Sequence, residues 1–261
     1  MLREVVEIVR EASLLMKSLD FTVRSKGGYE NLVTSADEAV QKFLCGKLSA
    51  LLPDSGFICE EDDIMDPDHQ YVWIIDPIDG TCNFSRKNAE CCISVALRKD
   101  SEIILGVVYN PYHKALYTAL KGRGARLNGR PIHVSDRPFG DGLLCAALCV
   151  YHKENAGICS EIIAEAFPKC NDVRRFGSAA LELCYLAQGF CDLYFEYVVN
   201  AWDYSAAYLV LKEAGGVLTG RDNQALTFDR PTILVGANNP ENHRILSDIV
   251  NRHTKPVPYE D

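Results

Sequence analysis

Hydrophobic residues recur along this chain with two different periods, and these periods predict its helices and strands. Apolar residues three or four positions apart from Val5 to Leu19 predict an amphipathic helix at the N-terminus. A second helix is expected over residues 36–52. Short apolar runs bounded by turn residues predict strands at 21–26 and 57–59.

The middle of the chain has the pattern of an antiparallel meander. Apolar segments at 92–98, 103–109 and 115–119 are separated only by short turns. Asn128-Gly129 then gives a strong hairpin signal, because both residues tolerate a positive φ.

Beyond residue 135, strands and helices alternate. Strands are expected at 143–150, 172–175, 191–196 and 232–236, and helices at 155–167, 178–188, 201–214 and 240–252. Ser178 is expected to be the N-cap of its helix rather than a nucleophile. This pattern predicts an α/β half (136–261) that follows an α+β half (1–135).

The hexapeptide Asp76-Pro77-Ile78-Asp79-Gly80-Thr81 follows an apolar strand at 71–75. The strand is expected to stop at Asp76, because Pro77 lacks an N–H and has a fixed φ. Gly80 permits a tight turn, and Thr81 is a good N-cap for the helix that follows. Carboxylates hold hard divalent cations, and free N–H groups at a helix start hold phosphate. The hexapeptide therefore predicts a site for a metal–phosphate complex.

Three other acidic residues are candidates for the same site. Glu60 ends the strand at 57–59, which is expected to lie beside the strand at 71–75, so its carboxylate can meet that of Asp76. Asp203 opens a helix after Trp202, and Asp37 lies in the first turn of another. Taken singly, each of these acidic residues could have an ordinary structural role, either on the solvated surface or in the first turn of a helix, where it complements the helix dipole.

Composition narrows the choice of partners and compartment. The formal net charge of −9 argues against direct binding to nucleic acid or anionic membranes. The 11 cysteines include no CxxC pair, which favours small buried hydrophobes in a reducing cytosol. The N-terminus lacks the apolar core of a signal peptide, and no apolar run is long enough to span a bilayer. We therefore expect a cytoplasmic protein.

Together these motifs resemble the inositol monophosphatase family of metal-dependent, lithium-sensitive phosphatases. The resemblance rests on the hexapeptide with Asn83-Phe84, on Trp202-Asp203 followed by Glu213-Ala214-Gly215-Gly216, and on the segments 31–37 and 57–61. The segment from Arg174 to Leu181 is similar to the bacterial-type branch. The resemblance implies a layered αβαβα sandwich, with the metal site between the two halves, and a homodimer.

The resemblance also implies roles for individual residues. The metal ligands would be Glu60, Asp76, the carbonyl of Ile78, Asp79 and Asp203. Thr81, hydrogen-bonded to Asp37, would orient and deprotonate the attacking water, and Glu60 belongs with these two in the catalytic set. Substrate would contact the N–H groups of Gly80 and Thr81, and also Asp79, Ala179, Glu196 and Asp203. Lys26 would lie near the metals.

The implied reaction is Mg²⁺-dependent hydrolysis of a small polyol phosphate, with inositol monophosphate as the leading candidate. Histidinol phosphate, fructose 1,6-bisphosphate and nucleotide phosphates remain open, as does a regulatory role as a protein partner in a transcription or RNA complex. One segment departs from the family pattern: after Phe84 the chain continues with Ser85-Arg86-Lys87. The cationic side chains of Arg86 and Lys87 either lie on the solvated surface or attract a second anionic group of the substrate.

Overall fold

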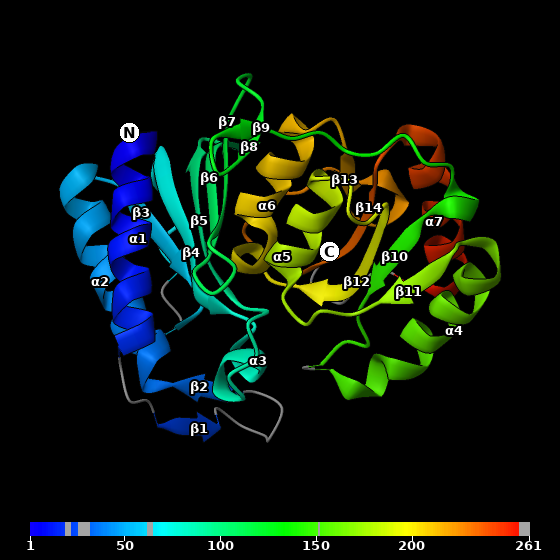
Figure 1. The fold of residues 1–261 in the computed structure, drawn as a ribbon, viewed down its shortest axis with the longest axis horizontal. Helices are drawn as coiled ribbons and strands as arrows, with labels where there is room; N and C mark the ends of the chain where they lie inside the picture. Colours follow the sequence, from blue (N-terminus) through cyan, green and yellow to red (C-terminus); the bar gives the residue numbers. More distant parts are fainter. Residues whose placement is uncertain (19–21, 26–31, 62–64, 151, 256–261) are drawn as a thin grey trace.

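The computed structural model describes residues 1–18, 22–25, 32–61, 65–150 and 152–255. Its elements stack in five layers, in the order helices, sheet, helices, sheet, helices (Figure 1). The helical layers are α1 (Leu2–Ser18) with α2 (Ser35–Leu51), α5 (Ala179–Ala187) with α6 (Ala201–Glu213), and α4 (Ala156–Ala166) with α7 (Pro240–His253). This arrangement confirms the predicted αβαβα sandwich.

The larger sheet contains the predicted meander. Among the described residues its strands lie in the order β3 (Gly56–Cys59), β4 (Tyr71–Asp79), β5 (Cys92–Lys99), β6 (Glu102–Asn110), β7 (Ala115–Leu120), β8 (Ala125–Leu127) and β9 (Arg130–Pro131). Within the described strands of this sheet, only β3 and β4 run parallel to each other. Asn128 and Gly129 have φ angles of 50° and 80°, as the predicted hairpin turn requires. A separate antiparallel pair is formed by β1 (Val23–Ser25) and β2 (Leu32–Thr34).

Strand β4 is buried on both faces, which explains its unbroken apolar run. Trp73 and Ile75 pack in the cluster that includes α1 and α2. Val72 and Ile74 belong instead to the cluster that includes α5 and α6. A strand with helices on both sides has no polar face, so its side chains need not alternate.

The prediction that this strand stops at Asp76 was wrong. Asp76 pairs with Ser94 on β5, and Asp79 pairs with Cys92, so the register shifts between them. This shift is a β-bulge. Because the bulged residues are not paired with β5, the sheet loses no hydrogen bond through the missing N–H of Pro77. Both aspartates are therefore anchored on a sheet ladder rather than on a loop.

The smaller sheet has the order β11 (Asp172–Arg174), β10 (Leu143–Ala146), β12 (Leu193–Val199), β14 (Thr232–Ala237) and β13 (Val217–Thr219) in the described part of the chain. β10 runs parallel to β11 and β12, whereas β14 is antiparallel to β12 and β13. β10 ends four residues earlier than the predicted end at residue 150, and β13 was not predicted. Short 3₁₀ turns are η2 (Phe139–Asp141), η3 (Lys153–Asn155), η4 (Phe167–Lys169) and η5 (Arg221–Asn223).

The predicted division at residue 135 falls in the segment between β9 and β10, which belong to different sheets. Whether the two halves are separate domains stays a prediction. No helix in the described ranges is long and apolar enough to cross a bilayer.

Candidate metal centre and substrate cavity

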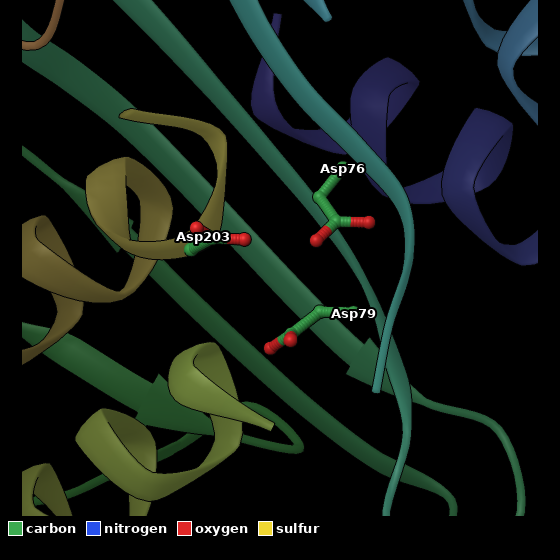
Figure 2. Close-up of side chains that lie close together, drawn as sticks. All are labelled: Asp76, Asp79 and Asp203. Atoms are coloured by element: carbon green, nitrogen blue, oxygen red, sulfur yellow. The ribbon is translucent and has the colours of Figure 1, made fainter. Parts of the chain in front are cut away.

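Three aspartates from two distant parts of the sequence meet between β4 and α6. Asp76 and Asp79 come from β4, and Asp203 comes from the first turn of α6. One carboxylate oxygen from each lies within 4.8 Å of the others. Figure 2 shows the three side chains converging on one space. The structure thus brings together the acids predicted from the hexapeptide and from Trp202-Asp203.

Glu60 reaches the same group from the neighbouring strand. β3 lies beside β4, as predicted, and runs parallel to it. The Glu60 N–H donates to the carbonyl of Ile75 over 3.3 Å. After burial, the nearby Glu60 carboxylate is among the causes that raise the pKa of both Asp76 and Asp203. A fourth acidic residue therefore stands at the ends of the two parallel strands.

Asp79 is held by the start of helix α5. Its Oδ2 accepts from the hydroxyl of Ser178 over 2.6 Å and from the N–H of Ala180 over 2.8 Å. Ser178 also accepts from the N–H of Leu181 over 3.3 Å, which confirms its predicted role as an N-cap. The sequence analysis gave Ser178 no role at the site, although a capped helix start following Gly177 was visible.

Burial and mutual repulsion disfavour the ionised form of these acids. Burial raises the pKa of Asp76 well above its usual range, and nearby Glu60, Asp79 and Asp203 raise it further. Burial, together with Asp79 and Glu60, likewise raises the pKa of Asp203. For Asp79, burial raises the pKa to about 6, although the hydrogen bonds from Ser178 and Ala180 oppose the shift.

The acidic group fits a hard divalent cation. Its donors are carboxylate oxygens, which Mg²⁺ prefers, and no His or Cys contributes to it. Among the described residues, none of the salt bridges involves Asp76, Asp79 or Asp203. Buried carboxylates without a cationic partner are costly, and a bound metal would remove that cost.

Thr81 is the first residue of the short helix α3 (Thr81–Ser85), not its N-cap as predicted. Gly80 takes the cap position with φ 89°, a conformation that strains other residues. The Thr81 hydroxyl is thereby free to donate to Asp37 Oδ1 over 3.2 Å or to the carbonyl of Ile78 over 3.0 Å. The predicted contact between Thr81 and Asp37 is present.

Asp37 is fully buried, and this burial raises its pKa. Its other contacts come from Thr34, whose N–H donates to Oδ2 over 2.9 Å. Asp37 therefore has an environment that favours proton uptake.

A cavity of about 630 Å³ opens beside these residues. Its lining includes the predicted substrate contacts Asp79, Gly80, Thr81, Ala179, Glu196 and Asp203. Asp76 and Asp37 are buried and lie outside its lining. The cavity therefore lies between Gly80 and Thr81 of one half and residues of the other half.

Not every predicted residue takes part. Arg86 and Lys87 are exposed and do not line the cavity, whereas Lys153 and Arg175 do. The sequence analysis overlooked these two, because nothing in a linear pattern links them to the hexapeptide. Lys26 lies outside the described residues.

Asn83 is a further residue to which the sequence analysis gave no separate role. Its amide nitrogen donates to the carbonyl of Glu90 over 2.8 Å and to the carbonyl of Phe176 over 2.7 Å. It thus ties the segment after the hexapeptide to the segment before α5.

Comparison with known proteins agrees with this geometry. The model of the inositol monophosphatase family matches residues 1–255. The chain is 34% identical over 236 residues to Nus factor SuhB of Escherichia coli K12, covering 87% of this chain and 88% of that protein. It is 32% identical over 223 residues to inositol-1-monophosphatase of Mesorhizobium japonicum, covering 85% and 83%.

Solved structures show the same fold. Inositol monophosphatase from Anabaena (Nostoc) sp. PCC 7120 superposes with a TM-score of 0.84 at 30% identity, covering 97% of this chain and 96% of that one. The acidic group therefore lies in a fold that a solved phosphatase shares.

Proposed function

This chain belongs to the inositol monophosphatase family, and from that premise we propose that it is a Mg²⁺-dependent phosphatase acting on a small polyol phosphate, with inositol monophosphate as the leading candidate. The observation that carries the proposal is the convergence of Asp76, Asp79 and Asp203 from β4 and α6 beside a cavity. A phosphate monoester is doubly charged, so its hydrolysis needs positive charge that these residues cannot supply alone.

The residues that would hold Mg²⁺ are Glu60, Asp76, Asp79 and Asp203, with the carbonyl of Ile78. Bound there, Mg²⁺ would neutralise the phosphate, lower the pKa of the attacking water and stabilise the leaving alkoxide. The ladder position of Asp76 and Asp79 keeps these two carboxylates in a fixed geometry.

Thr81 and Asp37 are suited to handle the proton of the attacking water. In our proposal the Thr81 hydroxyl accepts a proton from water as it passes its own proton to Asp37 over 3.2 Å. The raised pKa of the buried Asp37 favours that uptake. The oxygen of that water then bonds to phosphorus in line with the ester oxygen, whose bond to phosphorus breaks. The leaving alkoxide takes a proton from solvent, and no phosphoenzyme forms.

Substrate binding is assigned to the cavity lining. The N–H groups of Gly80 and Thr81 would bind phosphate, and Glu196, Ala179, Asp79 and Asp203 would contact the hydroxyls of the polyol. The Glu196 carboxylate accepts from the Tyr194 hydroxyl over 2.5 Å, which fixes its direction. Histidinol phosphate, fructose 1,6-bisphosphate and a nucleotide phosphate are the alternative substrates.

A homodimer, inhibition by lithium and a cytoplasmic location complete the proposal. The cytoplasmic assignment is supported by the eleven cysteines, all of which are free in the structure.

A regulatory role is the second candidate, favoured by the name Nus factor SuhB of the E. coli relative. In that case the chain would act by binding proteins of a transcription complex. A pull-down discriminates between the two roles: stoichiometric partners retained by an inactive Asp79→Asn variant would favour regulation.

The decisive experiment is a phosphate-release screen over phosphate esters, with and without Mg²⁺ and Li⁺. We expect release that requires Mg²⁺ and is greatest for a polyol monophosphate. Activity that ignores Mg²⁺ would contradict the mechanism, and a ranking led by a nucleotide would overturn the choice of substrate.

Asp79→Asn tests the site itself. The variant keeps an oxygen for the bonds from Ser178 and Ala180 but loses the charge, so we expect the fold to survive and kcat to fall at least about a hundredfold. Asp100→Asn is the matched control, because Asp100 is exposed in the β5–β6 turn, where its φ of 54° suits Asn equally well. Near-normal turnover by Asp79→Asn would remove the central claim.

A further inference from the structure

Helix α2 contacts the candidate site at three successive turns. Asp37, Gln41 and Cys45 are spaced four residues apart, so they lie on one face of the helix. Asp37 accepts from the Thr81 hydroxyl over 3.2 Å, which is the contact used in the proposed mechanism. The other two residues have no part in that mechanism, although both contact the chain beside Glu60.

The side-chain amide of Gln41 is bonded to both backbone groups of Glu61. Its nitrogen donates to the Glu61 carbonyl over 2.6 Å, and its oxygen accepts from the Glu61 N–H over 2.9 Å. Gln41 and Glu61 are each only 2% exposed. Buried backbone groups are costly without hydrogen-bond partners, so this amide stabilises one conformation of the main chain at Glu61.

These bonds flank a residue that is proposed to hold Mg²⁺. Glu60 is bonded to strand β4 through its own N–H, which donates to the Ile75 carbonyl over 3.3 Å. The next residue along the chain is bonded to α2 through Gln41. On the other side of Glu60, the Cys59 sulfur lies 3.8 Å from the Cys45 sulfur of α2. The main chain around Glu60 is therefore held between the strand and the helix.

The Glu60 carboxylate depends on such support more than the three aspartates do. Asp76 and Asp79 are on a sheet ladder, and Asp203 lies in the first turn of a helix of 13 residues. Glu60 follows the last residue of β3 and belongs to neither a strand nor a helix. A side chain on irregular backbone is directed less precisely than one on a strand or a helix, so hydrogen bonds from neighbouring elements must fix it.

We propose that Gln41 is a positioning residue for Mg²⁺ binding, which acts through the main chain at Glu61 to direct the Glu60 carboxylate into the acidic group. The inference rests on the proposed function, since it takes Glu60 as a metal ligand. Gln41 is not among the described residues that line the substrate cavity. Its loss should therefore weaken the metal site and leave the contacts of the phosphate ester unchanged.

Gln41→Met tests the proposal, because methionine matches glutamine in length and lacks the amide that makes both hydrogen bonds. Isothermal titration calorimetry should show Mg²⁺ binding weakened about tenfold or more, as loss of an outer contact of a metal ligand typically does. In phosphate release from the ester that the screen ranks first, the Mg²⁺ concentration for half-maximal rate should rise by the same factor. KM for that ester at saturating Mg²⁺ should stay as in wild type.

Asn238→Leu is the matched control, because it removes a buried amide of the same kind. Asn238 is also 2% exposed, its nitrogen donates to the Arg137 carbonyl over 2.9 Å, and its oxygen accepts from the Asn242 amide over 2.7 Å. It follows β14 at the end of the smaller sheet where β12 begins, and it is not among the described cavity residues. We expect a lower melting temperature and unchanged Mg²⁺ affinity.

A double-mutant cycle shows whether Gln41 acts through Glu60. In a Glu60→Gln background, Gln41→Met should weaken Mg²⁺ binding further by less than about twofold, because the carboxylate that it positions is gone. The rise of the melting temperature with Mg²⁺ concentration reports such weak binding. An undiminished loss in this background would overturn the proposal, since Gln41 would then act on the site by another route.

Unchanged Mg²⁺ affinity in Gln41→Met would also overturn it, as would an equal loss in Asn238→Leu. If Gln41→Met does not fold, Gln41→Asn decides by the same comparison, because its amide is one methylene too short to make both bonds. Wild type that binds Mg²⁺ but releases phosphate from no ester would refute the proposed function alone. Wild type that binds no Mg²⁺ would refute both.

Discussion

Glu182 shows how a single residue makes the stability of this protein depend on pH. Its side chain is 2% exposed, and its Oε1 accepts from the N–H groups of Phe176 and Gly177 over 2.6 and 2.9 Å. Burial raises its pKa to about 8 from an ordinary value of 4.5, nearby Glu196 adds to the shift, and the two N–H groups oppose it. Between these two values the folded state holds the proton more tightly than the unfolded state. Its contribution to stability is therefore present at low pH and is lost as the pH rises towards 8.

Glu182→Gln should remove this loss. Glutamine keeps an oxygen for the two N–H groups and carries no charge at any pH. We expect similar free energies of unfolding for both proteins at pH 5, and a variant more stable by about 1 kcal/mol or more at pH 8. Urea denaturation at the two pH values measures this difference. Parallel pH dependences in the two proteins would contradict the assignment.

At the scale of elements, helix α5 is coupled to the candidate metal centre through its N-cap. The Ser178 hydroxyl both caps α5 and donates to Asp79 Oδ2. Ser178→Ala should therefore weaken Mg²⁺ binding about tenfold or more, as loss of a hydrogen bond to a metal ligand typically does. Isothermal titration calorimetry with Mg²⁺ measures this affinity without reference to turnover.

Loss of the cap also destabilises the protein by about 1 kcal/mol, so a second variant is needed to separate the two effects. Asn239→Ala removes the cap of α7, where Asn239 accepts from the N–H of Asn242 over 2.9 Å. It should lower stability similarly while leaving Mg²⁺ affinity as in wild type. Equal Mg²⁺ affinities in the Ser178 and Asn239 variants would mean that Ser178 acts only on the helix.

At the scale of the whole molecule, the site depends on how helix α6 packs on the larger sheet. Figure 1 shows α6 in the middle layer, beside the meander, although its sequence belongs to the second half of the chain. The helix lies very close to β6 at Gly106, because a Cβ there would lie 2.5 Å from the carbonyl oxygen of Ala206. The missing side chain allows the helix to carry Asp203 up to Asp76 and Asp79.

Gly106→Ala should push α6 away from the sheet. We expect a loss of about 1–3 kcal/mol in stability, seen as a melting temperature several degrees lower, together with weaker Mg²⁺ binding. Gly46→Ala in α2 is the control, because nothing lies within 4 Å of a Cβ built there and alanine favours a helix. Unchanged melting and Mg²⁺ affinity in Gly106→Ala would show that α6 is not positioned by this contact.

The local pattern of the sequence determined most elements and the residue types of the site. Periodicity located α1, α2 and the meander because each buries a continuous apolar stripe or face. The Asn128-Gly129 turn and the Ser178 cap followed from local backbone chemistry. Predictions from local sequence rules failed where the tertiary structure changed the local geometry. Strand β4 continues past Pro77 because a bulge at this point removes the need for a proline N–H. Thr81 is not a cap because Gly80 takes that position.

Only the tertiary structure decided which side chains meet. The sequence marked Asp79 and Asp203 as candidates, but their approach within 4.8 Å depends on α6 crossing from the second half to the first sheet. Ser178 and Asn83 make hydrogen bonds that join the two halves of the chain, where no sequence spacing reports distance. The sequence by itself therefore determined which functional groups are available to this protein, because residue types and local patterns can be read along the chain. The tertiary structure decided which of these functional groups form one site, because only packing brings residues that are distant in sequence together.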